Sequence, residues 1–333
     1  MRFVNPAVTS FFLALLFCTP SASGAGTVSI QIDEWPVPWS GTRPRDPYVA
    51  PDGSVWFVGQ GGDYVARFDA ETGSFSKIDL QSGTGPHNLI VDEQGTVWYA
   101  GNRNAHIGKV NPKTGETVQY PMPDPDARDP HTLTFDGRGH IWFTVQHGNF
   151  VGRLAMDSGK VDLVPVPTSN ARPYGIVADD NGRPWVVELG SNKLATVDPE
   201  TLELSEVELL REAARPRRLG VTSDGDIWYV DYAEGYLGRY HPDSGEIDEW
   251  SAPSERGSQP YGMAVDGKDR IWFVETGPAD NRFVGFDPAS EAFFSITPIP
   301  SRAGAVRHMY YHARANAIWF GTDTNNIGRA VVP

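Results

Sequence analysis

Cysteine is almost absent from this chain of 333 residues, because Cys18 is the only one. Cys18 also lies in an N-terminal segment that we expect to be removed, so the mature protein would contain no thiol. A chain without cysteine cannot form a disulfide bond, use a thiol nucleophile or bind a metal through thiolates. Those three classes of chemistry are therefore excluded.

Long hydrophobic runs are scarce as well. Residues 1–25 contain the only one, an almost wholly apolar segment in which Arg2 is the single charge and which ends in small residues. This pattern predicts a secretory signal peptide rather than a spanning helix, with an uncleaved membrane anchor as the alternative. We therefore expect residues 26–333 to form one mature domain, located in the periplasm or outside the cell.

Positive charge is also in short supply. The chain carries 28 Lys and Arg against 42 Asp and Glu, a formal net charge of −14, and loss of Arg2 with the signal peptide would take it to −15. A surface this acidic repels nucleic acid and anionic lipid. We expect a small-molecule substrate instead, with no nucleic-acid partner, no membrane contact after signal cleavage, and a monomeric protein.

A repeat of 42 to 47 residues runs through the rest of the chain. Its most constant member is tryptophan, at Trp56, Trp98, Trp142, Trp185, Trp228, Trp272 and Trp319. A proline lies twelve residues before six of these, and Arg307 holds that place in the last copy. Three residues before each Trp comes Gly, Asp or Asn, the residue types that most readily adopt a positive φ, as a tight hairpin requires there.

Short strands account for the repeat. Each copy contains short runs with a period of two, such as residues 106–110 and 117–120, separated by turns rich in Gly and Pro. Four antiparallel strands in each of seven copies predict an all-β fold, a seven-bladed β-propeller. Helical arrays of similar period are excluded because their hydrophobic period is 3.6 residues. We expect the tryptophans to pack between neighbouring blades.

The two ends of the chain are expected to meet. The last copy reaches Pro333 without a fourth strand, whereas residues 30–38 look like a fourth strand with no blade before them and are similar to residues 247–253. We therefore predict that the N-terminal strand completes the last blade and closes the ring. This pairing would also remove an exposed strand edge that invites aggregation.

Topology predicts where chemistry can take place. If the strand after each Pro is innermost, its first residue and the loop after the Trp lie at the same end of the central channel, which we call the mouth. The residues at this first position are Arg45, His87, His131, Tyr174, Arg217, Tyr261 and His308. None is aliphatic, which a purely structural ring would not favour, so we expect the mouth to be the substrate side.

Two neighbouring copies differ from the others. Gly-Pro-His at residues 85–87 is followed by Asp-Pro-His at residues 129–131, and Gln146 and His147 follow the Trp of that second copy. Here the chain resembles the virginiamycin B lyase family (streptogramin B lyases), seven-bladed propellers that open cyclic depsipeptide antibiotics. The resemblance runs from about residue 30 to the end and includes recurring Ile-Trp-Phe, Ile-Gly-Arg and Pro-Tyr-Gly-Ile phrases.

The resemblance implies a metal site. In the family one His and two acids bind a magnesium ion, and a second His is the acid/base. By resemblance His87 and Asp129 would be ligands of Mg²⁺ or another divalent cation, and His131 would be the catalytic group. Gln146 holds the position of the second acid, a departure that removes one negative charge and should weaken metal binding. His147 could substitute for it, which would favour a transition metal.

The resemblance also implies the reaction. A cation bound to the ester would polarise it, a His would transfer protons, and elimination would break a C–O bond without water to give a linear product. Two alternatives stay open, namely a lactonase-type propeller hydrolase whose cation activates water, and a non-catalytic binding propeller. The sequence contains no Gly-x-Ser-x-Gly elbow for a serine hydrolase.

Several residues have a structural interpretation beside the functional one. The histidines after the prolines could satisfy backbone groups around the channel, and Asp129 could cap a turn. Three acids that lie three residues after their Trp could form a second acidic cluster, namely Glu188, Asp231 and Glu275. Arg45, Tyr174, Arg217, Tyr261 and His308 are expected to shape or line the substrate side.

Overall fold

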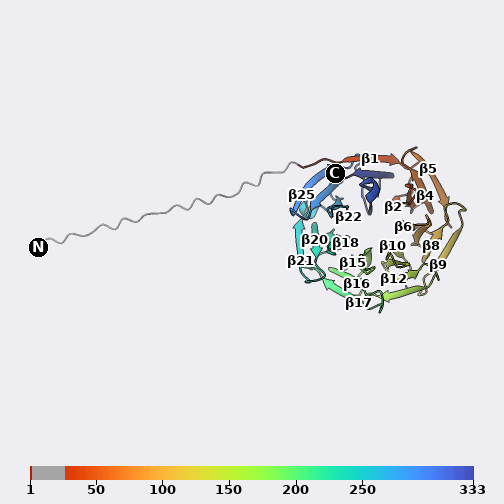
Figure 1. Cartoon of the computed structure of the whole chain (residues 1–333), viewed down its shortest axis with the longest axis horizontal. Coiled ribbons are helices and arrows are strands. Elements are labelled where there is room, and N and C mark those ends of the chain that lie inside the picture. Colours follow the sequence, from red (N-terminus) through yellow and green to blue (C-terminus); the bar gives the residue numbers. More distant parts are fainter. Residues whose placement is uncertain (2–26) are drawn as a thin grey trace.

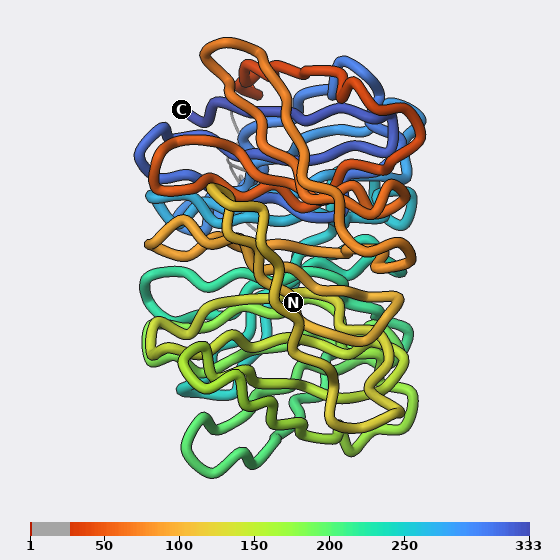
Figure 2. Tube along the Cα trace, turned by 90° about the vertical axis from the view of Figure 1, so that its right-hand side faces the viewer, coloured from red at the N-terminus to blue at the C-terminus, as the bar shows by residue number. Residues whose placement is uncertain are grey.

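The computed structural model describes Met1 and residues 27–333, so the predicted signal peptide lies outside the described residues apart from its first residue. The described residues form seven four-stranded antiparallel sheets, arranged as blades around a central channel (Figure 1). Figure 2 shows the ring from its edge, with strands crossing its thickness and turns on its two faces. The prediction of an all-β, seven-bladed propeller is confirmed.

All blades share one strand order from the channel outward. The innermost strands are β2 (Pro44–Val49), β6 (Pro86–Val91), β10 (Pro130–Phe135), β14 (Pro173–Ala178), β18 (Pro216–Val221), β22 (Pro260–Val265) and β26 (Met309–His312). The second strands are β3 (Val55–Gly59), β7 (Val97–Gly101), β11 (His140–Val145), β15 (Pro184–Glu188), β19 (Ile227–Asp231), β23 (Ile271–Glu275) and β27 (Ala317–Gly321). Each second strand thus carries one of the repeated tryptophans.

The third strands are β4 (Tyr64–Asp69), β8 (His106–Val110), β12 (Phe150–Ala155), β16 (Lys193–Val197), β20 (Tyr236–Tyr240), β24 (Arg282–Asp287) and β28 (Asn326–Val331). The outermost strands are β5 (Ser74–Asp79), β9 (Thr117–Pro121), β13 (Val161–Pro165), β17 (Leu204–Glu208), β21 (Ile247–Ser251), β25 (Ala292–Pro298) and β1 (Gln31–Pro36). Two short 3₁₀ helices are described, η1 (Glu255–Gly257) and η2 (Ala313–Ala315). None of the described helices is long and apolar enough to cross a bilayer.

The repeated tryptophans lie between the blades, as predicted. The described core divides into seven hydrophobic clusters, and each contains one of them. Trp142, for example, is fully buried in a cluster with Ile176 and Val186 of the next blade. Removing a buried aromatic side chain of this size typically costs about 3–5 kcal/mol of stability. The tryptophans therefore hold neighbouring blades together.

The hairpins that join the first and second strands have the predicted backbone conformation. The residue three before each Trp has a positive φ in every blade, from 46° at Asn316 to 93° at Gly139. An aspartate stabilises several of these turns. Asp92 accepts from the indole N–H of Trp98 at 2.9 Å and from the amide of Thr96 at 2.8 Å. The turn chemistry and the tryptophan thus stabilise the same hairpin.

The N-terminal strand closes the ring. β1 pairs antiparallel with β28, from Gln31 opposite Val331 to Pro36 opposite Asn326. The last blade therefore has the order β26, β27, β28, β1 from the channel outward. The prediction that strands from both ends of the chain share one blade is confirmed, and β28 has a partner on each side.

Candidate functional site

A β-bulge lies at the start of six of the seven inner strands. In β10, Pro130 pairs with Val145 but Leu133 pairs with Phe143, so the inner strand carries one residue more than β11 over this stretch. A bulge interrupts the strict alternation of side chains and re-aims them. As a result both His131 and Thr132 contact side chains of other blades.

Four of the predicted mouth residues form a continuous row of rings. The ring centre of His87 lies 3.6 Å from that of His131, which lies 4.2 Å from that of Tyr174. The hydroxyl groups of Tyr174 and Tyr261 are hydrogen-bonded to each other. His87 is 6% exposed and His131 is 2% exposed. The structure therefore brings together residues that are far apart in the sequence.

Arg218 and Thr132 fix the orientation of His131. Arg218 donates from Nη1 to Oγ1 of Thr132 at 3.0 Å, and the same Oγ1 lies 2.9 Å from Nδ1 of His131. Because a guanidinium can only donate, the hydroxyl hydrogen of Thr132 is free to be donated to Nδ1 of His131. In this arrangement the ring proton of a neutral His131 lies on Nε2.

One buried carboxylate balances two buried arginines next to the histidines. Oδ1 of Asp46 lies 3.7 Å from Nε of Arg45, and its Oδ2 lies 4.0 Å from Nη2 of Arg218. Oδ2 also accepts from the side-chain amide of Asn88 at 2.9 Å. Burial alone would raise the pKa of Asp46, but nearby positive charge, first that of Arg45, outweighs it and lowers the pKa. Asp46 is therefore ionised and already engaged by cations.

The histidines of the mouth are held in the neutral form. Burial lowers the pKa of His87 and of His131 well below the usual value, and the charges of Arg45 and Arg218 lower it further. For His308 burial and then the charge of Arg218 lower the pKa to about 4. Neutral imidazoles can donate or accept a hydrogen bond without carrying charge.

Asp129 is engaged by the loop that follows β11. Its carboxylate accepts from the backbone amide of His147 at 3.0 and 2.9 Å and from that of Gly148 at 3.1 Å. Nδ1 of His147 lies 2.6 Å from Oδ2 of Asp129, and the His147 side chain is 66% exposed. These contacts match the alternative interpretation, in which Asp129 caps a turn. The contacts also leave Nε2 of His147 free to accept a proton.

The donor set around His87 and His131 does not fit a hard divalent cation as the side chains lie. Among residues 27–333 no group of three or more His, Asp or Glu side chains is placed to hold a metal ion. The oxygens of Asp129 are hydrogen-bonded, Gln146 brings no charge, and two guanidinium groups lie beside the histidines. Guanidinium groups repel a cation, whereas Mg²⁺ prefers carboxylate and water oxygens.

The other predicted substrate-side residues also lie at the mouth. Nη1 of Arg45 donates to Oε1 of Gln60 at 2.9 Å. The guanidinium carbon of Arg217 lies 4.5 Å from the centre of the Tyr261 ring. His308 follows Arg307, whose carbonyl accepts from Nε of Arg218 at 2.8 Å. Positions predicted from the repeat thus converge on one end of the channel.

The three acids that follow their tryptophans hold separate loops. Glu188, Asp231 and Glu275 are all 0% exposed. Glu188 accepts from the hydroxyl of Ser191 at 2.6 Å, and burial raises its pKa to about 7. Asp231 accepts from the amide of Arg215 at 2.9 Å, and Glu275 accepts from an amide at 2.8 Å. Each acid therefore stabilises one loop, and the three do not form a common metal site within the described residues.

Reasoning from the sequence missed the residues one place further along. Asp46, Asn88, Thr132 and Arg218 each occupy the second position after the Pro, and all four take part in the hydrogen bonds and ion pairs around the histidines. A signal was present, because polar residues at two consecutive strand positions do not fit simple alternation. The bulge explains why both positions face partners in the channel.

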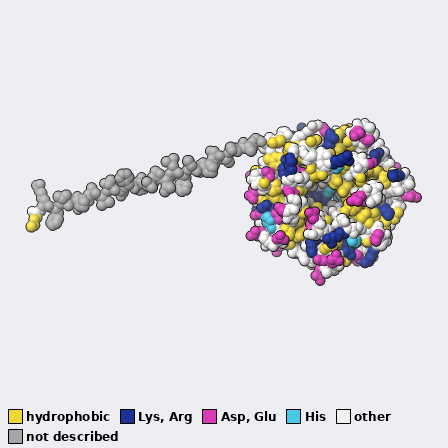
Figure 3. Space-filling model, in the orientation of Figure 1, with side chains coloured by type: hydrophobic (Ala, Val, Ile, Leu, Met, Phe, Trp, Pro, Cys, Tyr) yellow, Lys and Arg dark blue, Asp and Glu magenta, His cyan; other side chains and the backbone are white. Residues whose placement is uncertain are grey.

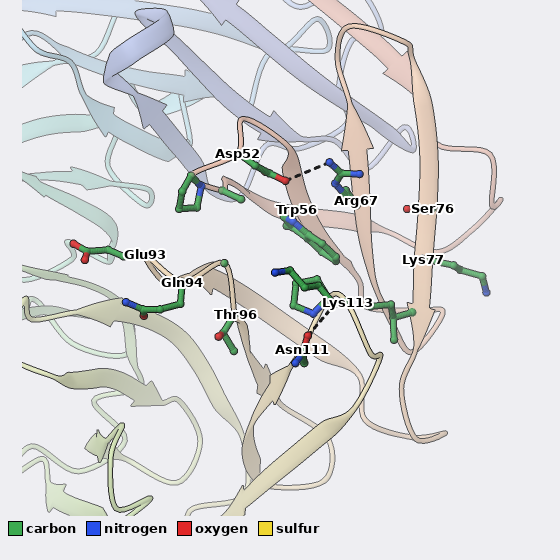
Figure 4. A pocket seen from close by; sticks show the side chains of 15 residues that line it. Asp52, Trp56, Arg67, Ser76, Lys77, Glu93, Gln94, Thr96, Asn111 and Lys113 are labelled. Carbon is green, nitrogen blue, oxygen red and sulfur yellow. Dashed lines mark hydrogen bonds and ion pairs between the residues drawn. The ribbon is translucent and has the colours of Figure 1, made fainter.

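The cavities show how the mouth differs from the rest of the ring. A cavity of about 360 Å³ inside the channel is lined mainly by apolar residues of the inner strands. Arg218 and His308 also line it. A groove of about 770 Å³ lies between the first two blades, near the hairpin ends. Figure 4 shows side chains that line it, such as Trp56 and Lys113. That groove contains none of the predicted site residues, so we assign it no role.

Comparison with known proteins gives a consistent result. Residues 15–280 match the model of the Virginiamycin B lyase family. A search of curated proteins finds no significant relative. Among solved structures, a streptogramin B lyase has 24% identity and a TM-score of 0.81, over 90% of this chain and 97% of that chain. Virginiamycin B lyase from Staphylococcus aureus has 23% identity and a TM-score of 0.83, over 92% and 100%.

A catalytically inactive variant of the Staphylococcus aureus enzyme, solved with quinupristin, matches equally well. The extracellular domain of a putative one-component system from B. thetaiotaomicron has 15% identity and a TM-score of 0.71, over 90% of this chain and 39% of that chain. Identities this low show the fold alone.

Proposed function

This chain belongs to the virginiamycin B lyase family, and from that premise we propose that it is a carbon–oxygen lyase that opens a cyclic ester or related small molecule at the mouth of the propeller. The observation that carries this proposal is the contact between His87 and His131, two neutral and almost fully buried imidazoles whose rings lie 3.6 Å apart. We further propose that the protein acts outside the cytoplasm, which agrees with the extracellular origin of one neighbouring propeller.

We assign to His131 the stabilisation of the charge that develops on the leaving oxygen. In the elimination, a proton leaves a carbon next to a carbonyl group, the C–O bond on the adjacent carbon breaks, and the bonding electrons leave with the ester oxygen. Thr132 and Arg218 hold His131 with its Nε2–H available to that oxygen. A neutral imidazole can donate a hydrogen bond to this leaving oxygen and oppose the negative charge that develops on it.

His147 is the second histidine suited to proton transfer. Its Nδ1 is held by Asp129 at 2.6 Å, which orients the ring and leaves Nε2 as a proton acceptor. We assign it the role of accepting the proton from carbon. Asp129 would then be a positioning residue for His147 in place of the metal ligand implied by the family resemblance.

Magnesium dependence stays a prediction. Nδ1 of His87 is buried without a hydrogen-bond partner among the described residues and is the donor most available to a metal. Asp129 would have to release its loop, and Gln146 would contribute only a carbonyl oxygen. When bound, a divalent cation would supply Lewis-acid polarisation of the ester. The roles assigned to His131 and His147 do not depend on this cation, since the surrounding donors do not fit a cation as they lie.

The test is activity on a streptogramin B lactone, with conversion to a linear product followed by chromatography and the mass of that product measured, with and without EDTA and added magnesium. Elimination leaves the mass of the substrate unchanged, and this is the result we expect. A product heavier by one water would identify the lactonase-type hydrolase. Full activity in EDTA would remove magnesium from the proposal, whereas loss with recovery on adding magnesium would restore the ligand roles of His87, Asp129 and Gln146.

A non-catalytic binding propeller is the remaining alternative. Binding of the lactone with no conversion to a linear product, seen as an unchanged chromatographic retention time over a long incubation, would support it.

A further inference from the structure

A cavity of about 550 Å³ beside the mouth is rich in positive charge. Three arginines line it, namely Arg172, Arg215 and Arg217, together with Tyr232 and Gln259. The arginines and Gln259 lie in or just before the first strands of three neighbouring blades, and Tyr232 lies in the loop after β19. None of the described residues that line the cavity is an aspartate or glutamate. The cavity thus presents cations without carboxylates to balance them.

The three arginines differ from most arginines of the chain. Among the described residues, fourteen others lie within 4.0 Å of a carboxylate oxygen, and none of these three does. The chain has a net charge of −14, and Figure 3 shows acidic side chains spread around the rim of one face. In so acidic a protein, carboxylates are abundant and their exclusion from one cavity needs an explanation.

Neutral groups hold two of these arginines, Arg217 and Arg215, in place. The guanidinium carbon of Arg217 lies 3.6 Å from the ring centre of Tyr232 and 4.5 Å from that of Tyr261. Cation–π contacts of this kind fix a guanidinium without neutralising its charge. Nε of Arg217 is buried and has no hydrogen-bond partner among residues 27–333. Arg215 donates from Nη1 to backbone carbonyl groups. The positive charges therefore remain available to a ligand.

The cavity is continuous with the row of rings at the mouth. Arg217 contacts Tyr261, the hydroxyl of Tyr261 is bonded to that of Tyr174, and the ring of Tyr174 contacts His131. A ligand whose charged end lies against Arg217 would extend along these rings. The charged cavity and the proposed reaction centre are thus connected by contacts between neighbouring side chains.

We propose that this cavity binds the oxyanion group, a carboxylate or a phosphate, of a small-molecule ligand. The planar guanidinium fork matches the geometry of both groups and can bind either in a bidentate manner. Arg217, already fixed by two rings, loses little side-chain entropy on binding, and Arg172 and Arg215 add charge. The inference deepens the proposed function and rests on it, because it adds to the natural substrate an anionic group beside the mouth, whereas the streptogramin B lactone serves only to test ring opening.

Isothermal titration calorimetry tests this, with citrate and pyrophosphate as separate probes at constant ionic strength. We expect the wild-type protein to bind at least one probe, and Arg217→Gln and Arg172→Gln each to weaken its binding at least tenfold. Arg217→Lys, which keeps the charge but loses the fork, should fall between wild type and Arg217→Gln. Arg138→Gln is the matched control, because that side chain is 49% exposed and lies in the hairpin after β10, at the far end of the channel.

Each outcome of this binding experiment supports or overturns the inference without testing the proposed lyase function. Binding of citrate only identifies a carboxylate ligand, and tighter binding of pyrophosphate identifies a phosphate ligand; both support it. Absence of binding to wild type at millimolar probe, or equal binding by Arg217→Gln with an unchanged melting temperature, overturns it. No turnover is measured, so a protein that binds citrate but opens no lactone would contradict the proposed function and leave this inference standing.

Discussion

The tryptophan position and the position after the proline belong to the same repeat but differ in how constant they are. The first holds Trp in all seven blades, and each Trp lies in a core between blades. The second holds Arg, His or Tyr, and these side chains meet one another across the channel. A position that repeats serves the packing that every blade needs. A position that varies within a ring can assemble one site from several blades.

The largest effect should follow from removing a repeated tryptophan. Trp142→Ala leaves a cavity between two blades and should lower the free energy of unfolding by about 3–5 kcal/mol. Urea denaturation followed by circular dichroism measures this. His131→Ala, at the variable position, should change stability far less. Equal losses in the two variants would break the distinction between packing and site positions.

Asp129 offers a second, smaller contrast. Asp129→Asn keeps the size of the side chain but weakens the charge-assisted bonds to the loop and to His147, and should cost about 1–2 kcal/mol of stability. If His147 accepts a proton, the same variant should also lower kcat roughly tenfold while KM changes little. In a variant that already carries His147→Gln, adding Asp129→Asn should cause no further loss of kcat. A rate unchanged in Asp129→Asn would leave Asp129 with a structural role only.

The mouth histidines should make stability depend on pH. Burial lowers the pKa of His308 to about 4, whereas an unfolded histidine titrates near its usual value of 6.5. Between these values the unfolded chain binds more protons, so stability falls as the pH falls from about 6.5 to about 4. His308→Asn should reduce that slope by up to about 1.4 kcal/mol per pH unit. Identical slopes in urea titrations of the two proteins would show that His308 can be protonated in the fold.

The smallest effect concerns the inner hairpins. Gly139 has a φ of 93°, so Gly139→Ala should cost about 1 kcal/mol of stability. Gly139→Asn should cost less, because Asn316 occupies the equivalent place in the last blade with a φ of 46°. Thermal melts compare the two. A larger loss for Asn than for Ala would contradict the account of the hairpin turns.

The sequence was sufficient to predict the fold and the end of the ring that carries the polar residues. Repetition made this prediction possible, since all seven copies contain the same pattern for the hairpin, the tryptophan and the order of strands. The detail of the site was not predictable in this way. The bulge that places Thr132 and Arg218 beside His131 leaves no single sequence signature.

Nor could the sequence show that Asp129 is engaged by its own loop. A carboxylate that caps a turn and one that binds a metal look the same in a list of residues. The charged cavity was hidden for a similar reason. Only the contacts among residues 27–333 reveal that Arg172, Arg215 and Arg217 lack the carboxylate partners that fourteen other arginines have.

The most direct test of the account compares two histidines on inner strands, one at each end of the channel. His131 lies at the mouth, and His312 ends β26 at the other end. With a streptogramin B lactone as substrate, His131→Ala should lower kcat by about 10²–10⁴-fold, and His312→Ala should retain the wild-type rate. Full activity of His131→Ala, with the loss falling on His312→Ala or on neither, would contradict the placement of the chemistry at the mouth.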